Sequence, residues 1–123
     1  MVIVRLAGDA LWVWSPIPLQ PDLAEAVTRI GVVTHLVSPN KLHHLFLPEW
    51  MQHFPQARLW GPASTIAKRP DLRFELALTE QPPEAWYSDI DQAWFRGSPL
   101  LDEVVFFHRA SRSVIFADLV QAC

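Results

Sequence analysis

The sequence predicts an α/β domain in which helices and a mixed β-sheet form layers. Three observations support this fold class. Strand-like pairs stand at both ends of the chain, strands alternate with helices between them, and residues 113–119 carry apolar side chains on both faces. A strand that is apolar on both faces is typical of the interior of a sheet covered on each side. The length is sufficient for a single domain, residues 1–123, with its own core.

The first predicted elements are a hairpin and a helix. Residues 2–6 and 11–14 are β-prone and are separated by Gly8 and Asp9, a pair typical of tight turns. The prolines that follow exclude regular pairing, because proline has no backbone donor. Residues 21–30 then form a predicted helix, with proline in the first turn, apolar residues at helical spacing and a glycine directly after it.

The remainder of the chain alternates between β-prone runs and helical patterns. Strands are predicted at 32–37, 57–60, 74–78, 92–96, 103–108 and 113–118, and helices at 45–54 and 63–67. Residues 82–84, Pro-Pro-Glu, resemble the start of a further helix. We expect 32–37 and 113–118 to be interior strands of the sheet.

A polar loop, residues 38–44, follows the predicted strand 32–37 and carries the adjacent histidines His43 and His44. In α/β proteins, ligands usually bind in the crevice outside the carboxyl ends of the strands. Imidazole is also the side chain that serves most readily as a proton shuttle or metal ligand near neutral pH. Asp118 stands where the last predicted strand ends, so we expect it to meet this loop.

Composition and motifs exclude several classes of function. The net charge of −3 and the pI near 5.9 are unlike the basic face of a general nucleic-acid binder. No apolar run approaches the ~20 residues that span a bilayer, and the single cysteine, Cys123, fits a reducing cytoplasm. The sequence has no phosphate-binding glycine loop, no Gly-x-Ser-x-Gly elbow and no His-Glu-x-x-His motif.

Four stretches of the sequence are similar to the metallo-β-lactamase superfamily, and more narrowly to a shortened bacterial branch of it. They are Leu-Trp-Val-Trp-Ser-Pro at 11–16, Pro-Asn-Lys-Leu-His-His-Leu-Phe-Leu at 39–47, Lys-Arg-Pro-Asp-Leu at 68–72 and Asp-Glu-Val-Val-Phe-Phe-His at 102–108. The resemblance covers nearly the full chain. It implies a mixed β-sheet sandwich flanked by helices, shortened by loss of the C-terminal part of the fold.

The resemblance also implies a metal site that has lost ligands. The superfamily carries His-x-His-x-Asp-His after a strand, and in this chain Ser38 and Asn40 occupy the first two histidine positions. His43 occupies the aspartate position, and His44 occupies the third histidine position. Asp118 matches the aspartate that bridges two metal ions after a later strand.

The ligands that remain are enough for one zinc or other divalent ion rather than for a pair. Residues 98–101 lack the later histidine of the pattern, and the chain ends before a final one. The implied function is a metal-dependent hydrolase of esters or amides with a degenerate site. Its candidate ligands are Asn40, His43, His44 and Asp118.

Two other interpretations stay open. The loop stands before a predicted helix, so a metal-free module can hold an anion such as phosphate there. The anion-binding residues are then Asn40, Lys41, His43 and His44. In the other interpretation the chain is a structural module, in which Asn40 caps the helix and Asp118 bonds to backbone.

We also expect the chain to form a homodimer in the cytoplasm. The mean hydropathy is +0.13, and the resemblance implies that the elements covering the far side of the sheet are missing. Uncovered apolar surface typically marks an interface, and closed twofold dimers are its commonest form. The expected ligand is a small-molecule substrate of unknown identity, with no nucleic-acid or membrane partner.

Overall fold

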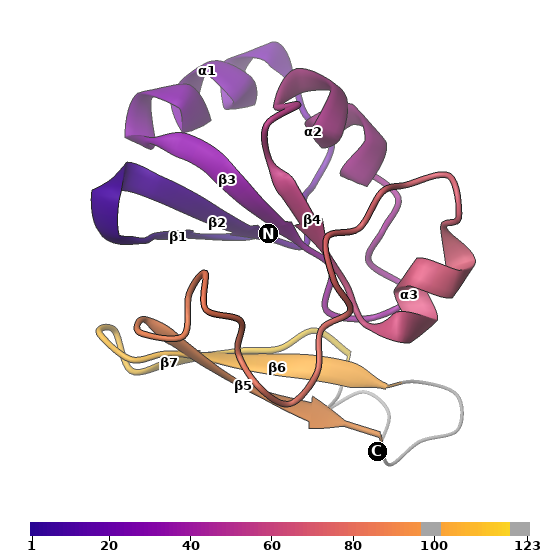
Figure 1. Ribbon diagram of the computed structural model, residues 1–123. Coiled ribbons are helices and arrows are strands. Elements are labelled where there is room, and N and C mark those ends of the chain that lie inside the picture. Colours follow the sequence, from indigo (N-terminus) through magenta and orange to yellow (C-terminus); the bar gives the residue numbers. More distant parts are fainter. Residues whose placement is uncertain (97–101, 119–123) are drawn as a thin grey trace.

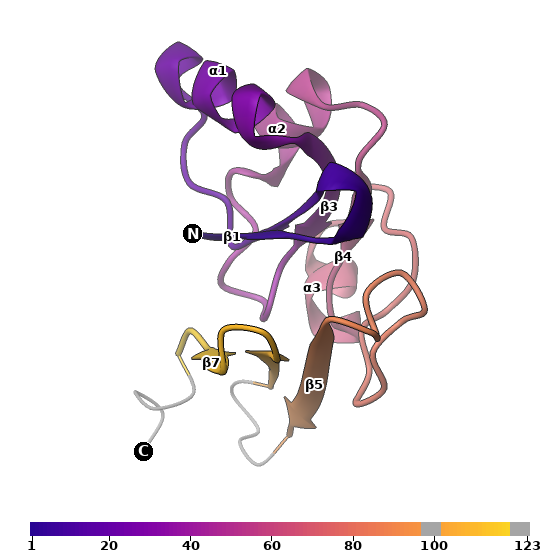
Figure 2. The same ribbon diagram turned by 90° about the vertical axis from the view of Figure 1, so that its left-hand side faces the viewer.

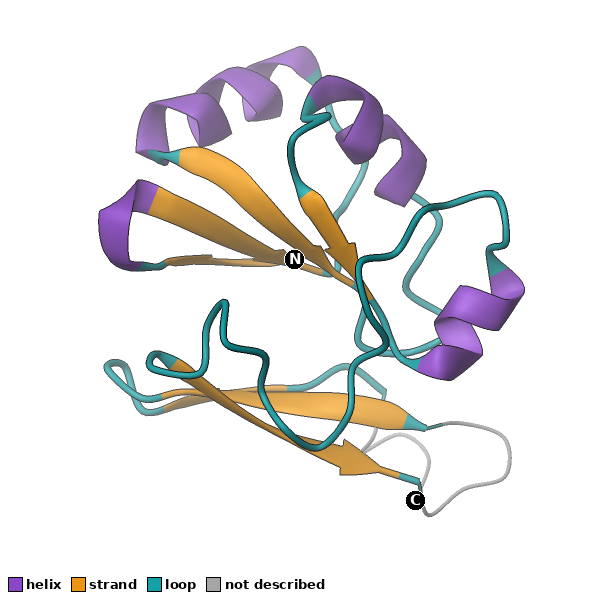
Figure 3. Ribbon diagram, in the orientation of Figure 1, coloured by secondary structure: helices purple, strands orange, loops and turns teal. Residues whose placement is uncertain are grey.

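The structure, a computed structural model, describes residues 1–96 and 102–118. Figure 1 shows two sheets lying face to face, with helices over the outer face of the upper sheet. Figure 2, a view at right angles, shows α1 and α2 on one side of the first sheet and β5 and β7 on the other. Figure 3 distinguishes the same layers by type of secondary structure. This mixed content of helices and sheets confirms the predicted α/β class.

The first sheet is mixed and contains the predicted hairpin. Its strands, in order across the sheet, are β1 (Val2–Arg5), β2 (Ala10–Trp14), β3 (Val32–Val37) and β4 (Arg58–Trp60). β1 pairs antiparallel with β2, whereas β2, β3 and β4 are parallel neighbours. Gly8 makes the turn of the hairpin with a positive φ of 74°, which glycine adopts without strain. β3 lies between two strands, so its prediction as an interior strand is confirmed.

Helices connect the parallel strands and cover one face of the first sheet. α1 (Pro21–Ile30) begins at a proline, as predicted, and buries Ala24 and Val27 against the sheet. Gly31 ends the helix, and a Cβ at this position would collide with the carbonyl oxygen of Asp9. α2 (Leu47–His53) follows β3, and α3 (Ala63–Lys68) follows β4. No helix among the described residues has both the length and the apolar character to cross a membrane.

The second sheet is antiparallel and packs on the other face of the first. Its strands are β5 (Ile90–Phe95), β6 (Glu103–His108) and β7 (Ser113–Ile115), with β6 in the middle. The core between the sheets is rich in tryptophan, and the rings of Trp12 and Phe106 meet edge to face with centroids 4.9 Å apart. Trp86, from the segment before β5, packs in the same way against Trp60 at 4.8 Å. Burial of these large rings holds the two sheets together.

Two predicted elements in the middle of the chain are wrong. Residues 74–78 do not form a strand, and they contribute one isolated parallel bridge between Gly61 and Ala77. β4 is only three residues long and is soon followed by Pro62, which has no N–H donor, so the pairing cannot extend. Residues 82–84 start a turn rather than a helix, because the chain passes within a few residues into β5.

The prediction that 113–118 is an interior strand is also wrong. β7 ends at Ile115 and lies at the edge of its sheet, and Leu119 is outside the described residues. Ile115 points into the core, whereas Val114 and Phe116 are 58% and 46% exposed. Apolar side chains on both faces therefore indicate an uncovered apolar face here, and not a strand between two layers.

Candidate functional site

Three segments from both sheets meet at one end of the molecule. Ser15 follows β2, and the loop 38–46 follows β3. Because β2 and β3 are parallel, these two segments leave the sheet at the same edge, where α/β proteins commonly bind ligands. Asp118 follows β7 of the second sheet and reaches the same place. Asp118 therefore meets the loop at Asn40 and His43, although β7 is an edge strand, whereas His44 contacts Arg69 instead.

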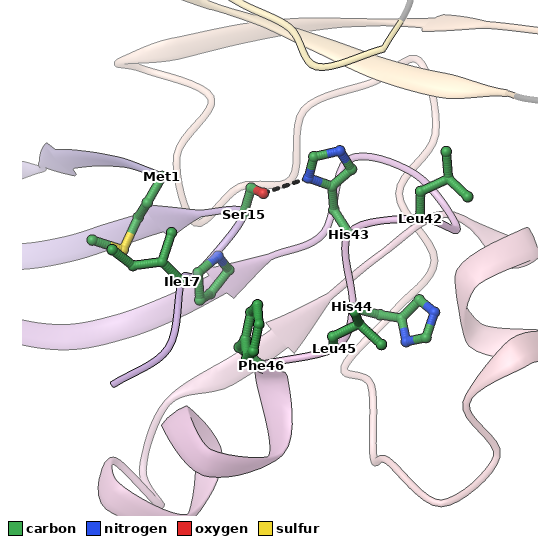
Figure 4. Close-up of a pocket in the computed structure, with 9 residues that line it drawn as sticks. Met1, Ser15, Ile17, Leu42, His43, His44, Leu45 and Phe46 are labelled. Carbon is green, nitrogen blue, oxygen red and sulfur yellow. Dashed lines mark hydrogen bonds between the residues drawn. The ribbon is translucent and has the colours of Figure 1, made fainter. Parts of the chain in front are cut away.

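A chain of two short hydrogen bonds joins Ser15, His43 and Asp118, which we call the triad. Ser15 Oγ lies 2.6 Å from His43 Nδ1 (Figure 4), and His43 Nε2 lies 2.7 Å from Asp118 Oδ2. With the Asp118 carboxylate ionised, a neutral imidazole donates its Nε2–H to Asp118 and accepts the Ser15 proton at Nδ1. The roles of the ring nitrogens are exchanged relative to the usual serine protease triad, but the order serine, imidazole, carboxylate is the same.

Asn40 is completely buried and donates a hydrogen bond to the Asp118 carboxylate of the triad. Its Nδ2 donates to Glu103 Oε1 at 2.7 Å and to Asp118 Oδ2 at 3.1 Å. Its Oδ1 accepts the backbone N–H of Leu42 at 2.8 Å, which folds the loop back on itself. Asn40, which follows β3 of the first sheet, is thus hydrogen-bonded to residues at the ends of β6 and β7 of the second sheet, and it also fixes the conformation of the loop 38–46. It does not cap α2, whose N-cap is Phe46.

Glu103 fixes the position of Asp118 and was missed by sequence reasoning. This carboxylate has no solvent exposure and accepts hydrogen bonds from Asn40, from Ala117 N at 2.9 Å and from Asp118 N at 2.8 Å. Three donors offset the cost of burying its charge. The signal that was available is an acidic residue at the first position of a strongly apolar strand, β6.

Ser15 was also missed, because sequence reasoning looked for a serine within a glycine elbow. It directly follows β2 and adopts a positive φ of 51°, which is unusual for a residue other than glycine. This backbone conformation costs roughly 1–2 kcal/mol, and such strained residues cluster at functional sites. The backbone N–H of Ser15 bonds to Val37 O at 2.8 Å, so the strained residue is anchored to β3.

His44 does not join the triad. Figure 4 shows its imidazole turned away from the bond between Ser15 and His43. It meets Arg69 instead, whose Nη1 lies 3.2 Å from His44 Nδ1 and donates to His44 O at 3.1 Å. Partial burial, followed by the positive charges of Arg69 and Lys68, lowers the pKa of His44. This histidine is therefore neutral near physiological pH.

The donor set at the site does not fit a resident metal ion. The structure brings Asn40, His43 and Asp118 together but places His44 on Arg69. Both ring nitrogens of His43 already have hydrogen-bond partners, and Asn40 presents its amide N–H₂ to the carboxylates. Across residues 1–96 and 102–118, no group of three His, Cys, Asp or Glu side chains is arranged to hold a metal ion. The segment 98–101, where the later histidine is missing, lies outside the described residues.

The triad opens into a pocket of about 300 Å³. Figure 4 shows the pocket between the end of β2 and the start of α2. Its lining consists of Met1, Ser15, Pro16, Ile17, Leu42, His43, His44, Leu45 and Phe46. Ser15 is largely buried, with 9% exposure, and the His43 side chain is 29% exposed, so the two residues form part of the wall of a mostly apolar pocket.

Comparison with known proteins identifies the family of the chain. Neither the curated proteins nor the solved structures that were searched contain a significant relative. No comparison links the chain to the metallo-β-lactamase superfamily, so that resemblance stays a prediction. One family matches over residues 1–123, the whole length of the sequence. The chain therefore belongs to the family described as domain of unknown function DUF4336.

Proposed function

We propose that this protein is a serine-type hydrolase that cleaves carboxylic esters with the triad Ser15, His43 and Asp118. The observation that carries the proposal is the pair of hydrogen bonds of 2.6 Å and 2.7 Å that joins the three side chains in the order nucleophile, base, carboxylate. The position of Ser15 and His43 on the wall of the pocket supports it further. A serine hydroxyl becomes a useful nucleophile only with such a base beside it.

The triad hydrolyses an ester in two half-reactions. Ser15 Oγ attacks the carbonyl carbon while its proton passes to His43 Nδ1, and Asp118 stabilises the imidazolium that forms. The C–O bond to the alcohol then breaks, and His43 gives the proton to the departing oxygen. Water attacks the acyl group on Ser15 in the same way. This second step releases the carboxylic acid and restores the serine hydroxyl.

We propose that the scaffold is of the metallo-β-lactamase type and that the triad stands where that superfamily holds its metal ions. Support comes from the layered sheets, from the loop 38–44 after β3 and from Asp118 after β7. The donor set, with His44 on Arg69, argues for a hydrolase that works without a resident metal. An anion-binding role for the loop has less support, because the Glu103 and Asp118 carboxylates face Asn40 and repel an anion.

We propose, in addition, that two copies associate through the outer face of the second sheet. Among the described residues this face carries the exposed side chains of Phe95, Phe107 and Val114. A shallow hollow of about 260 Å³ lies among them. An apolar surface of this kind supports a self-complementary twofold contact.

Covalent labelling of Ser15 tests the hydrolase proposal. The purified protein is treated with a fluorophosphonate and its intact mass is measured. We expect a single adduct, located on Ser15 by peptide mapping and absent from Ser15→Ala. Hydrolysis of p-nitrophenyl butyrate is expected to fall by about a hundredfold or more in Ser15→Ala and in His43→Ala, the usual contribution of a general base and its nucleophile.

Two controls make this test specific. Ser64, which donates to Asp102 Oδ1 at 2.7 Å, is a hydrogen-bonded serine outside the triad, so Ser64→Ala should retain the adduct and the rate. A metal chelator should leave the rate unchanged. Loss of activity on chelation, with recovery on adding zinc, would show that a metal rather than Ser15 carries the reaction.

A further inference from the structure

We propose, resting on the proposed ester hydrolysis, that the pocket beside Ser15 accepts a linear apolar acyl chain, so that the preferred substrates are esters of aliphatic carboxylic acids. Nothing in the triad itself selects a substrate, because any carbonyl that reaches Ser15 meets the same nucleophile. Selection therefore rests on the walls of the pocket.

The walls carry no side chain with a permanent charge. Of the side chains that line the pocket, only those of His43 and His44 titrate, and the others apart from Ser15 are apolar. Met1 also brings the amino group of the N-terminus to this part of the molecule. The lowered pKa of His44 keeps this histidine neutral. No side chain on these walls offers a phosphorylated or carboxylate-bearing substrate a permanent positive charge, whereas a hydrocarbon chain meets mainly apolar side chains there.

Four exposed apolar side chains gather around this pocket. Ile17, Leu42, Leu45 and Phe46 all line it and are between 37% and 68% exposed. Single exposed apolar residues are ordinary on protein surfaces, but a cluster at the mouth of a pocket marks a binding surface. An acyl chain that covers these four side chains gains the free energy of their removal from water.

The walls are also fixed in place before a substrate arrives. Trp50 of α2 is completely buried and donates its indole N–H to the backbone oxygen of Ile17 at 2.6 Å. This bond ties the segment after Ser15 to the helix that follows Leu45 and Phe46. The two apolar walls are therefore joined directly by a hydrogen bond, and a pocket held together in this way loses less entropy on binding.

A series of p-nitrophenyl esters tests the inference. We expect kcat/KM to rise by about a hundredfold from acetate to octanoate, as each added methylene gains contact with the walls. Leu45→Ser should lower the ratio of octanoate to acetate turnover by about tenfold, because it removes an apolar contact. Leu76→Ser, at an exposed leucine away from the pocket, is the matched control and should leave the ratio unchanged.

A binding measurement separates failure of this inference from failure of the proposed function. Methyl octanoate is titrated into Ser15→Ala, and displacement of an apolar fluorophore is followed. Saturable displacement that weakens in the double variant with Leu45→Ser supports the acyl pocket even if no ester is turned over. Equal turnover of all esters, with Ser15 labelled and no displacement, would overturn the acyl pocket and leave the hydrolase intact.

Discussion

At the scale of single residues, Asn40 is the side chain on which the site depends most. It is the amide between two carboxylates, and its N–H₂ group donates to Glu103 and Asp118 at once. Without it, two negative charges would lie together in a place where little water screens them. Asn40 therefore sets the distance between the sheets at the site as well as the position of Asp118.

The variant Asn40→Asp tests this role with almost no change in shape. It replaces the donating amide with a third carboxylate, so we expect the free energy of unfolding at pH 7 to fall by about 3–5 kcal/mol. The loss should shrink towards pH 4, where carboxyl groups begin to take up protons. Urea unfolding of the variant and the wild-type protein at pH 7 and at pH 4 measures this difference in the free energy of unfolding.

The control is Gln52→Glu, the same amide-to-acid change at an exposed position of α2. It should alter the stability by no more than about 0.5 kcal/mol. If Asn40→Asp is as mild as this control at pH 7, the carboxylates do not depend on the Asn40 amide.

The sequence predicted part of this site. Asn40, His43 and Asp118 were found through their place after strands and through the family resemblance, but that resemblance also included His44. Asp118 was found although 75 residues separate it from His43, because it matches the bridging aspartate of the superfamily. Ser15 and Glu103 match no ligand position of the superfamily, so nothing in the sequence connected them with partners that are 28 and 63 residues away.

At the scale of elements, β3 carries a buried histidine that makes the first sheet sensitive to acid. His35 is only 4% exposed, and its Nδ1 accepts the indole N–H of Trp60 on the neighbouring strand β4 at 3.0 Å. Burial, followed by the charge of Arg58, lowers the pKa of His35 to about 4. The folded protein therefore holds this imidazole neutral, whereas the unfolded chain protonates it near pH 6.5.

Stability should consequently depend on pH through His35. Because the pKa of His35 is lowered in the folded state, its contribution to the free energy of unfolding is complete above about pH 6.5. This contribution is lost as the pH falls towards 4. The loss at pH 5 amounts to about 2 kcal/mol. His35→Asn keeps a neutral acceptor for Trp60, so the difference in unfolding free energy between the two proteins should change with pH by this amount. A constant difference from pH 7.5 to 5 would mean that His35 is protonated as easily when folded as when unfolded.

The elements themselves were predicted best where their signals are local. α1 starts at a proline and ends before a glycine, β3 has its predicted bounds and so has β6. The segment 74–78 was predicted as a strand because its composition suits one, but a strand needs a partner. β4 is only three residues long, and its contact with this segment is limited to the isolated bridge and to two backbone hydrogen bonds, from Glu75 N to Leu59 O and from Leu78 N to Gly61 O.

At the scale of the whole molecule, the two sheets differ in how far their outer faces are covered. α1 and α2 cover the first sheet, whereas the outer face of the second sheet is bare among the described residues (Figure 1). The sequence showed apolar side chains on both faces of 113–118, but it could not show which face is covered. That depends on how the layers stack, and the stacking is decided by the tryptophan core between the sheets.

The proposed homodimer predicts that one charge on this face will separate the copies. Light scattering on the wild-type protein at micromolar concentration should give twice the chain mass of 14.1 kDa. Val114→Lys places an ammonium group on the outer face and should give the mass of a single chain, because burying that charge is costly. Val32→Lys, at a valine that is 67% exposed on the first sheet, should remain a dimer. A monomeric wild-type protein would refute the dimer directly.

The triad draws its members from the beginning, the middle and the far end of the chain, and this has a consequence for the newly made protein. Ser15 leaves the ribosome early, but 75 residues separate His43 from its carboxylate partner Asp118. A nascent chain, or a fragment cut before β7, thus carries the serine without the complete triad. With the proposed chemistry, the nucleophile becomes reactive only after β7 and Asp118 have been synthesised, and chains without Asp118 leave the esters around them intact.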